Sequence, residues 1–161
     1  MSGMEIERKF LVKDSSYRQK AHSSSHIRQA YLCSGHGKTI RVRTRDSDAY
    51  LTIKGPSADG GLSRYEFEKK ISLDEAEQLF NLCEPGMIDK TRFLVACGEH
   101  TFEVDEFHAD NDGLVIAEVE LKAPDEPYGK PDFIGEEVTG DRRYYNSHLR
   151  AHPYCEWSDK K

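Results

Sequence analysis

The chain has 161 residues, of which 32% are charged and 37% are hydrophobic, and its formal net charge at pH 7 is −6. This length is typical of a single domain that buries its own core. The negative charge argues against general affinity for nucleic acids or membrane surfaces, although it does not exclude a local basic pocket.

The four cysteines are scattered along the chain and form no CxxC pair, so neither a zinc knuckle nor a redox motif is indicated. No apolar stretch reaches the length of a transmembrane helix, and the charged N-terminus does not resemble a signal peptide. We therefore expect a cytoplasmic protein with reduced thiols and no membrane partner.

The first predicted strand, residues 4–12, has two faces of different chemistry. Side chains alternate between the faces of a strand, so Glu5, Glu7 and Lys9 share one face and apolar residues occupy much of the other. A charged face is ordinarily the solvated side of a sheet. This strand alone leaves open whether its charged face meets solvent or serves a function.

The same alternation recurs along the chain. Strands are predicted at residues 26–32, 39–45, 49–54, 65–71, 87–95, 101–107 and 114–122. The Glu-x-Glu-x-Lys spacing occurs three times, beginning at Glu5, Glu66 and Glu118. Other charged faces carry Arg41, Arg43, Arg45, Lys54, Lys90, Arg92, Glu103 and Asp105. The recurrence indicates that the pattern belongs to the whole sheet, and Tyr31 fits either of its faces.

Helices are predicted in three places. Residues 14–17 favour a short helical turn. Ser72 and Glu75 form a capping box that begins an amphipathic helix, which should pack on the outside of a sheet. A final helix is expected from about 141 to 150, followed by a tail at 155–161. Loops are expected at residues 23–25 and 124–131.

Two architectures fit these strands. In an ordinary sandwich the charged faces would look outward and their apolar alternates would form the core. In a closed antiparallel barrel of about eight strands the charged faces would look inward, and helices and loops would cover the outer apolar face. Buried charges are costly unless they are compensated, so such a barrel must hold water, metal and a polyanion.

The chemistry of the charged residues suggests what that interior would bind. Paired glutamates are oxygen ligands suited to Mg²⁺ or Mn²⁺. Arginine and lysine donate hydrogen bonds to phosphate oxygens, arginine in a bidentate fashion. Carboxylates and basic side chains in one cavity therefore favour a metal-bound polyphosphate.

The segment Glu5-Ile6-Glu7-Arg8-Lys9 matches the ExExK motif of the CYTH superfamily, the triphosphate tunnel metalloenzymes, and it lies near the N-terminus as it does there. Further matches follow in the expected order: Arg41-x-Arg43, Lys54, Glu66-x-Glu68, Lys90-x-Arg92 and Glu118-x-Glu120. ExExK alone is a weak motif, but the ordered series is specific and covers nearly the whole chain. The sequence resembles the compact, inorganic tripolyphosphatase members of this family.

The resemblance implies a mainly β (α+β) fold, in which residues 1–161 form one domain. Its centre would be a closed eight-stranded antiparallel barrel with a charged interior, a few flanking helices, and a C-terminal helix that closes one end. The implied phosphate-binding residues are Lys9, Arg41, Arg43, Lys54, Lys90 and Arg92. The implied metal ligands are Glu5, Glu7, Glu66, Glu68, Asp105, Glu118 and Glu120. The implied catalytic residues are Lys9, Glu5, Glu7, Arg41 and Glu120.

The expected reaction is hydrolysis of a terminal phosphoanhydride with Mg²⁺ or Mn²⁺, in which positive groups neutralise the transferring phosphoryl group. The compact chain lacks a long insertion that would clasp an adenine or thiamine ring, which favours inorganic tripolyphosphate. A class IV-type adenylyl cyclase and a thiamine triphosphatase are alternatives. A non-catalytic polyphosphate-binding module is an alternative of another class. A homodimer is allowed, and no nucleic-acid partner is expected.

Overall fold

The computed structural model describes residues 2–157. The strands are β1 Ser2–Val12, β2 Ser23–Gly35, β3 Lys38–Arg45, β4 Asp48–Ala58, β5 Ser63–Ile71, β6 Ile88–Cys97, β7 His100–Phe107, β8 Val115–Leu121 and β9 Ile134–Glu137. The helices are α1 Tyr17–Lys20, α2 Leu73–Phe80 and α3 Asn146–Leu149, with 3₁₀ turns at Asp59–Gly61, Ala109–Asn111, Arg142–Tyr144 and Tyr154–Glu156. None of the helices in residues 2–157 is long and apolar enough to cross a membrane.

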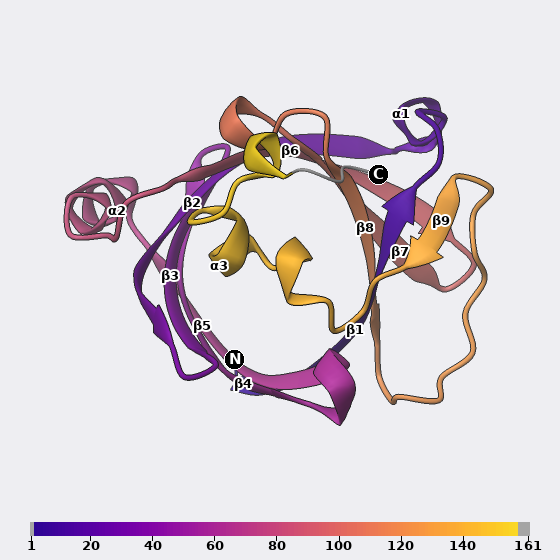
Figure 1. Cartoon of the computed structure of the whole chain (residues 1–161), viewed down its shortest axis with the longest axis horizontal. Helices are drawn as coiled ribbons and strands as arrows, with labels where there is room; N and C mark the ends of the chain where they lie inside the picture. The colour runs from indigo at the N-terminus through magenta and orange to yellow at the C-terminus, as the bar shows by residue number, and fades with distance from the viewer. Residues whose placement is uncertain (1, 158–161) are drawn as a thin grey trace.

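Eight antiparallel strands close into a barrel (Figure 1). Their order is β5-β4-β3-β2-β6-β7-β8-β1, and a pairing between β5 and β1 completes the ring. β9 pairs with the far end of β1, beyond the residues that pair with β5. The mainly β, closed eight-stranded barrel that the sequence predicted is confirmed.

The register of the strands brings the charged faces to the inside of the barrel. Opposite residues of antiparallel strands project from the same face. Glu7 pairs with Glu120 and Lys9 pairs with Glu118, while Lys54 of β4 pairs with Glu66 of β5. The charged alternates of neighbouring strands therefore face one another, and their apolar neighbours along each strand face outward.

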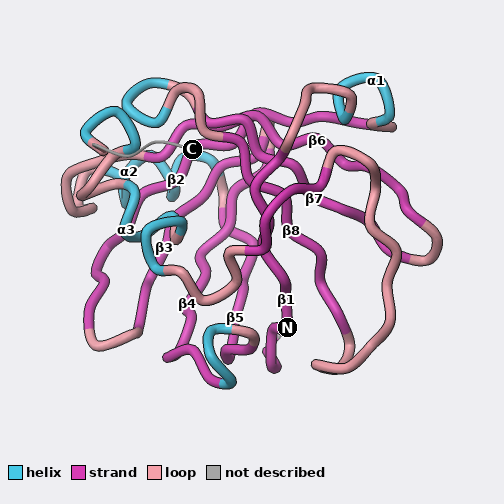
Figure 2. Tube along the Cα trace, turned by 45° about the vertical axis from the view of Figure 1, so that its right-hand side comes forward, coloured by secondary structure: helices cyan, strands magenta, loops and turns pink. Residues whose placement is uncertain are grey.

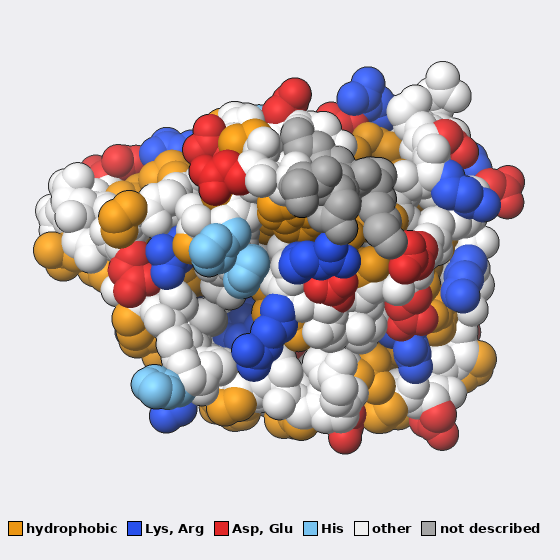
Figure 3. Space-filling view, viewed as in Figure 1, with side chains coloured by type: hydrophobic (Ala, Val, Ile, Leu, Met, Phe, Trp, Pro, Cys, Tyr) orange, Lys and Arg blue, Asp and Glu red, His pale blue; other side chains and the backbone are white. Residues whose placement is uncertain are grey.

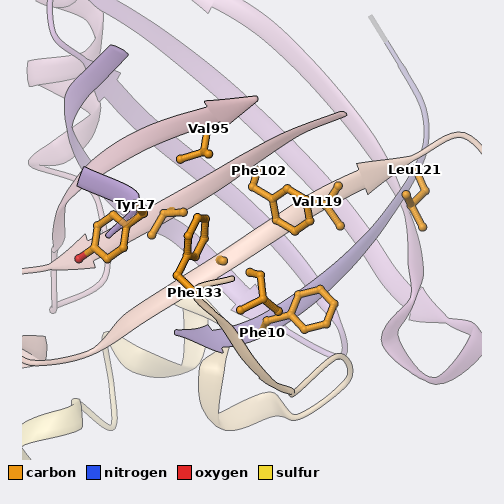
Figure 4. Packing of buried hydrophobic residues seen from close by; sticks show 10 residues of the cluster. Phe10, Tyr17, Val95, Phe102, Val119, Leu121 and Phe133 are labelled. Atoms are coloured by element: carbon orange, nitrogen blue, oxygen red, sulfur yellow. The ribbon is translucent and has the colours of Figure 1, made fainter. Parts of the chain in front are cut away.

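The outward-facing apolar residues of β1, β7 and β8 form a core outside the ring (Figure 4). Phe10, Phe102 and Val119 are buried there beneath Phe133, which lies just before β9, and Tyr17 of α1. The rings of Tyr17 and Phe133 meet edge to face, with centroids 5.9 Å apart. The segment before β9 and the short helix α1 thus cover the outer apolar face on this side, as the barrel interpretation required.

α2 covers the outer face on another side of the barrel, as Figure 1 shows. The predicted capping box is present: the Ser72 hydroxyl accepts a hydrogen bond from the Glu75 N–H at 3.0 Å, and Glu75 accepts one from the Ser72 N–H at 2.8 Å. The fully buried Ala76 packs against Val42 and Ala49. The predicted start of the helix and its position outside the sheet are both confirmed.

Apolar side chains fill one end of the barrel interior. Ile88, Phe107 and Ile116 continue the inward-facing positions of their strands and pack against Tyr144 and Leu149 of the C-terminal segment. Figures 1 and 2 show this segment crossing the opening of the ring. In place of one helix at 141–150, the chain forms a 3₁₀ turn and the four-residue α3.

Other local predictions differ from the structure in instructive ways. Ser23–Ser25, expected to be a loop, begin β2 because they pair with residues 92–94 of β6. Within the expected tail, Trp157 packs edge to face on Tyr144 at 5.3 Å, and residues 158–161 lie outside the described chain. By contrast, the expected loop at 124–131 is confirmed, because these residues form no helix or strand. Long-range pairing and packing, which local patterns do not report, explain the differences.

Replacing Phe133 by alanine tests the outer core. We expect the free energy of unfolding to fall by about 3–5 kcal/mol, because the change removes an aromatic ring from a fully buried site. Chemical denaturation followed by circular dichroism measures the change. Leu82→Ala, at a side chain that is 71% exposed, is the control and should cost less than about 0.5 kcal/mol. Equal losses in the two variants would contradict this packing.

Candidate active site

The barrel encloses a polar cavity of about 230 Å³, which we call the charged chamber. Among the described residues, seven carboxylates and seven lysine or arginine side chains line it. The acidic residues are Glu5, Glu7, Glu66, Glu68, Glu103, Glu118 and Glu120, and the basic residues are Lys9, Arg41, Arg43, Arg45, Lys54, Arg64 and Arg92. Every site residue predicted from the sequence is in this set except Lys90 and Asp105.

The two signs of charge occupy different halves of the chamber. The consecutive strands β7, β8, β1 and β5 carry all seven carboxylates, and we call this half the acidic wall. Strands β4, β3 and β6 carry most of the basic side chains and form the basic wall; the exceptions are Lys9 on β1 and Arg64 on β5. A ligand that spans the chamber therefore meets carboxylates on one side and cations on the other.

The carboxylates of the acidic wall repel one another. Burial raises the pKa of Glu7, and the neighbouring charges of Glu118 and Glu5 raise it further, to well above its ordinary value. Burial also raises the pKa of Glu120, with further contributions from Glu5 and Glu103. Since a bound cation would offset this repulsion, the acidic wall has the electrostatics of a metal site.

Lys9 lies where the acidic wall meets the C-terminal segment. Its Nζ is 3.8 Å from a Glu118 carboxylate oxygen, donates to the Tyr144 carbonyl at 3.3 Å, and lies 4.9 Å from the centre of the Tyr145 ring. Burial lowers the pKa of Lys9, but Glu118 and Glu7 outweigh that effect and raise it. The ammonium group is therefore charged and held in place.

Two arginines of the basic wall, Arg41 and Arg43, form no ion pair with a carboxylate among the described residues, unlike Lys54 and Arg92. Burial lowers the pKa of Arg43 to about 9, and the charges of Arg41 and Arg92 contribute to the shift. Arg43 donates to the neutral Gln29 at 3.0 Å, and Arg41 donates to the neutral Thr52 at 3.2 Å. The Nε of Arg41 is buried and has no hydrogen-bond partner among residues 2–157. An anion in the chamber would satisfy these groups.

Lys54 connects the two walls. Its Nζ lies 3.0 Å from a carboxylate oxygen of Glu5 and 3.4 Å from one of Glu66. Both carboxylates come from strands that flank each other in the ring, so one ammonium group holds β1, β4 and β5 together at the chamber. This lysine is compensated inside the protein, unlike Arg41 and Arg43.

Lys90 and Asp105 lie behind the chamber lining. Asp105 is 2.8 Å from the Lys90 Nζ and accepts two hydrogen bonds from Arg92, at 2.7 and 2.9 Å. Burial raises the pKa of Asp105, but Arg92 and Lys90 outweigh it and hold the pKa well below its usual range. Lys90 also donates to Asn146 of α3 at 3.2 Å. The structure thus gives this pair a supporting position beneath Arg92 and α3.

Several lining residues were not assigned to the site from the sequence. Tyr31, which fitted either face, is inside, and its hydroxyl accepts a hydrogen bond from Gln29 at 3.2 Å. Glu103 lies 3.4 Å from Arg92, and its place on a charged strand face could have indicated it. Tyr145 and its neighbours reach the chamber from the C-terminal segment. Tyr145 does not lie on a strand, so the alternation of side chains along strands could not have indicated it.

The acidic wall fits a hard divalent ion. Within residues 2–157 no three carboxylate, histidine or cysteine side chains already converge on one point. Mg²⁺ is usually bound through one or two carboxylates, with waters and substrate phosphates completing its coordination. Paired carboxylates such as Glu5 with Glu7 and Glu118 with Glu120 therefore suit an ion that arrives with a phosphate ligand.

Comparison with known proteins shows the family. The CYTH domain matches residues 3–146. The chain belongs to the CYTH domain family. The inorganic triphosphatase of Acetivibrio thermocellus is 44% identical over 153 residues, which cover 94% of this chain and 96% of that protein. The inorganic triphosphatase of Nitrosomonas europaea is 34% identical over 149 residues, which cover 90% and 95%. The resemblance based on the ordered charged pairs is confirmed.

Solved structures agree with the fold. The crystal structure of an inorganic triphosphatase aligns with a TM-score of 0.62 at 31% identity and covers 91% of this chain and 93% of that chain. A putative adenylyl cyclase from Hippeastrum, which has a dominant triphosphatase activity, aligns with a TM-score of 0.60 at 14% identity, covering 74% and 80%. At that identity the second likeness concerns the fold alone.

The buried ion cluster behind the chamber makes a prediction about stability. Asp105→Asn should lower the free energy of unfolding by about 3–5 kcal/mol, because it leaves Lys90 and Arg92 buried without their countercharge. Asp48→Asn is the matched control: Asp48 pairs with Lys70 on the exposed surface, and its loss should cost less than about 1 kcal/mol. Urea titrations of the wild type and the two variants measure these losses. If Asp105→Asn were as stable as the control, the stabilising role of the ion cluster would be contradicted.

Proposed function

We propose that this CYTH protein is an inorganic triphosphatase, which hydrolyses a terminal phosphoanhydride of tripolyphosphate to pyrophosphate and phosphate. The observation that carries the proposal is the pair of opposed walls: one carries all seven carboxylates of the lining, and the other carries five of its seven cations. A metal-bound chain of phosphates complements both walls at once. The 44% identity to an inorganic triphosphatase over nearly the whole chain supports the same substrate.

Phosphate binding falls to the basic wall in this proposal. Arg41, Arg43 and Arg92 donate to phosphate oxygens, since a guanidinium group presents a planar fork of donors that matches them. Lys54 and Lys9 add positive charge from either side. Lys90, expected from the sequence to bind phosphate, acts instead by holding Arg92 through Asp105, because its side chain is fully buried.

Metal binding falls to the acidic wall. Glu5, Glu7, Glu118 and Glu120 would hold Mg²⁺ or Mn²⁺, with Glu66 and Glu68 as further ligands. When bound, a divalent ion supplies positive charge to the phosphate oxygens and lowers the pKa of its water. Asp105, also expected among the ligands, is committed to Lys90 and Arg92 and is left out of this set.

Lys9 and a glutamate carry out the chemistry. A water oxygen attacks the terminal phosphorus, the bond to the bridging oxygen breaks, and pyrophosphate leaves. The ammonium group of Lys9, held by Glu118, stabilises charge on the transferring group without having to reorganise. A glutamate of the Glu5/Glu7 or Glu118/Glu120 pairs that is not bound to the metal accepts the proton of the water.

The substrate is tested by phosphate release from tripolyphosphate, ATP and thiamine triphosphate, each with Mg²⁺, Mn²⁺ or EDTA. We expect tripolyphosphate to give the highest kcat/KM and EDTA to abolish turnover, because the acidic wall then lacks its cation. Cyclic AMP formed from ATP would replace the proposal with a cyclase. Binding of tripolyphosphate without any phosphate release would favour a polyphosphate-binding module.

Lys9→Ala tests the proposed role of the held ammonium group. Removing one preorganised electrostatic donor should lower kcat by about 10²–10³-fold, measured as phosphate release from tripolyphosphate. Lys69→Ala, at an exposed residue that does not line the charged chamber, is the control and should retain full activity. Normal turnover by Lys9→Ala would contradict the mechanism.

Location and assembly are part of the same proposal. A cytoplasmic location is supported by the four cysteines, none of which forms a disulfide in the described chain. A homodimer is supported by exposed apolar side chains on β1, β4 and β5, namely Met4, Ile53, Tyr65 and Phe67. Sedimentation of the purified protein measures the assembly.

A further inference from the structure

The C-terminal segment carries two histidines that the proposed reaction does not use. His148 and His152 are four residues apart in the chain. The His152 N–H donates to the His148 carbonyl at 2.9 Å, and the Arg150 N–H donates to the Asn146 carbonyl at 3.2 Å. These are hydrogen bonds of α-helical type, so the helical turn continues past the end of α3. Residues four apart on a helix share one face, and both imidazole rings therefore project from the same side.

The two imidazole rings of this pair lie close together. Their centres are 4.7 Å apart, and their planes are inclined by 34°. Two imidazole nitrogens that bind one tetrahedral ion at about 2.0–2.1 Å place their ring centres roughly 5 Å apart. The fold thus holds the two rings at the separation that a shared metal ion requires. Histidines at this spacing on a helix are a recurring zinc-binding pair in other proteins.

The state of the His148 ring suits a metal ligand. Its Nδ1 is buried and has no hydrogen-bond partner among residues 2–157. Burial lowers the pKa of His148, and the neighbouring charge of His152 lowers it further. A metal ion binds imidazole in its neutral form, which this environment favours. His152 is exposed, so an ion from solvent has access to the pair.

The backbone that carries the pair is anchored on several sides. Leu149, between the two histidines, is fully buried in the apolar cluster at the end of the barrel. The His152 carbonyl accepts a hydrogen bond from the Trp157 indole N–H at 3.1 Å. The guanidinium group of Arg150 donates to Glu84 at 2.6 Å. A backbone held in this way loses little conformational entropy when a ligand binds, so the pair is preorganised.

The pair lies outside the charged chamber. Neither histidine lines that chamber. His148 and Arg142 instead line a second cavity, of about 410 Å³, which shares Tyr145 and Ser147 with the chamber. Figure 3 shows histidine side chains exposed over α3, on the face where the C-terminal segment crosses the barrel opening. Any ion bound there is therefore separate from the carboxylates of the acidic wall.

We propose that His148 and His152 together bind one divalent transition-metal ion, of which Zn²⁺ is the representative, outside the charged chamber. Imidazole ligands suit Zn²⁺, Ni²⁺ and Cu²⁺, whereas Mg²⁺ prefers the oxygen ligands of the acidic wall. Water completes the coordination of the ion. A bound ion links the two histidines across one helical turn and stabilises the segment that carries Tyr145 and Ser147 to the chamber. The site goes beyond the proposed triphosphatase activity and does not depend on it.

Calorimetric titration with ZnCl₂ in excess Mg²⁺ tests the proposal on the wild type and three variants. His152→Gln should weaken zinc binding by more than about tenfold, a loss that even an outer-shell partner of a metal causes. His152→Cys should retain binding, because a thiolate is also a zinc ligand. His22→Gln, at an exposed histidine that lines neither cavity, is the matched control and should bind zinc as the wild type does.

Electron paramagnetic resonance with Cu²⁺ in place of zinc identifies the ligands. Imidazole nitrogens give a hyperfine signature that carboxylates lack, and none of the described residues that line the charged chamber is a histidine. We expect this signature in the wild type and in His22→Gln, and its loss in His152→Gln. Zinc should also raise the urea midpoint of the wild type by more than that of His152→Gln, because the ion binds the folded pair.

Equal zinc affinities of the wild type and His152→Gln would overturn the proposal. So would an equal weakening in His22→Gln, because the ion would then be bound elsewhere, or a Cu²⁺ spectrum without imidazole nitrogen. None of these measurements uses turnover. A wild type that fails to hydrolyse tripolyphosphate would end the proposed function and leave the test of the histidine pair intact.

Discussion

Burying charges of both signs inside one barrel is the constraint on which this structure depends. Each buried ion costs several kcal/mol unless a partner compensates it. Asp105 receives two such partners, Lys90 and Arg92, and Lys54 lies between two glutamates. Not every charge is paired: Glu7 lies beside the carboxylates of Glu118 and Glu5, and the buried Nε of Arg41 has no partner in the described part of the chain. The uncompensated charges lie on opposite walls, where a metal and a phosphate chain would compensate them together.

The barrel can hold an electrostatically strained chamber because two apolar clusters lie outside the ring and a third fills the end of the interior beyond the chamber. Phe10 and Phe133 pack outside the ring, Ala76 fastens α2 to another side, and Leu149 belongs to the apolar cluster that fills one end. Closure leaves no free edge among the eight strands, so backbone hydrogen bonding holds the ring even where its inner side chains repel one another. Stability comes from the outer faces of the strands and from one end of the interior, whereas the site chemistry occupies the rest of the inner faces.

Alternation along the strands carried most of the correct predictions. It identified Glu5, Glu7 and Lys9 as one face, and the ordered recurrence of such faces indicated a polar interior. Alternation could not separate residues that line the chamber from residues that are buried behind the lining. Lys90 and Arg92 lie on the same face of β6, but Lys90 is fully buried and only Arg92 lines the chamber. Nor could it place Tyr145 or Arg142, which reach the cavities from a segment without strand periodicity. Depth and long-range packing are properties of the folded chain that local spacing does not encode.

The central claim is that metal and phosphate bind on opposite walls of one chamber. Anomalous diffraction from a crystal grown with Mn²⁺ and a non-hydrolysable triphosphate analogue tests it most directly. The account predicts an anomalous peak beside Glu5, Glu7, Glu118 and Glu120, with phosphate density against Arg41, Arg43 and Arg92. Manganese on the arginine side, or an analogue bound outside the charged chamber, would contradict it.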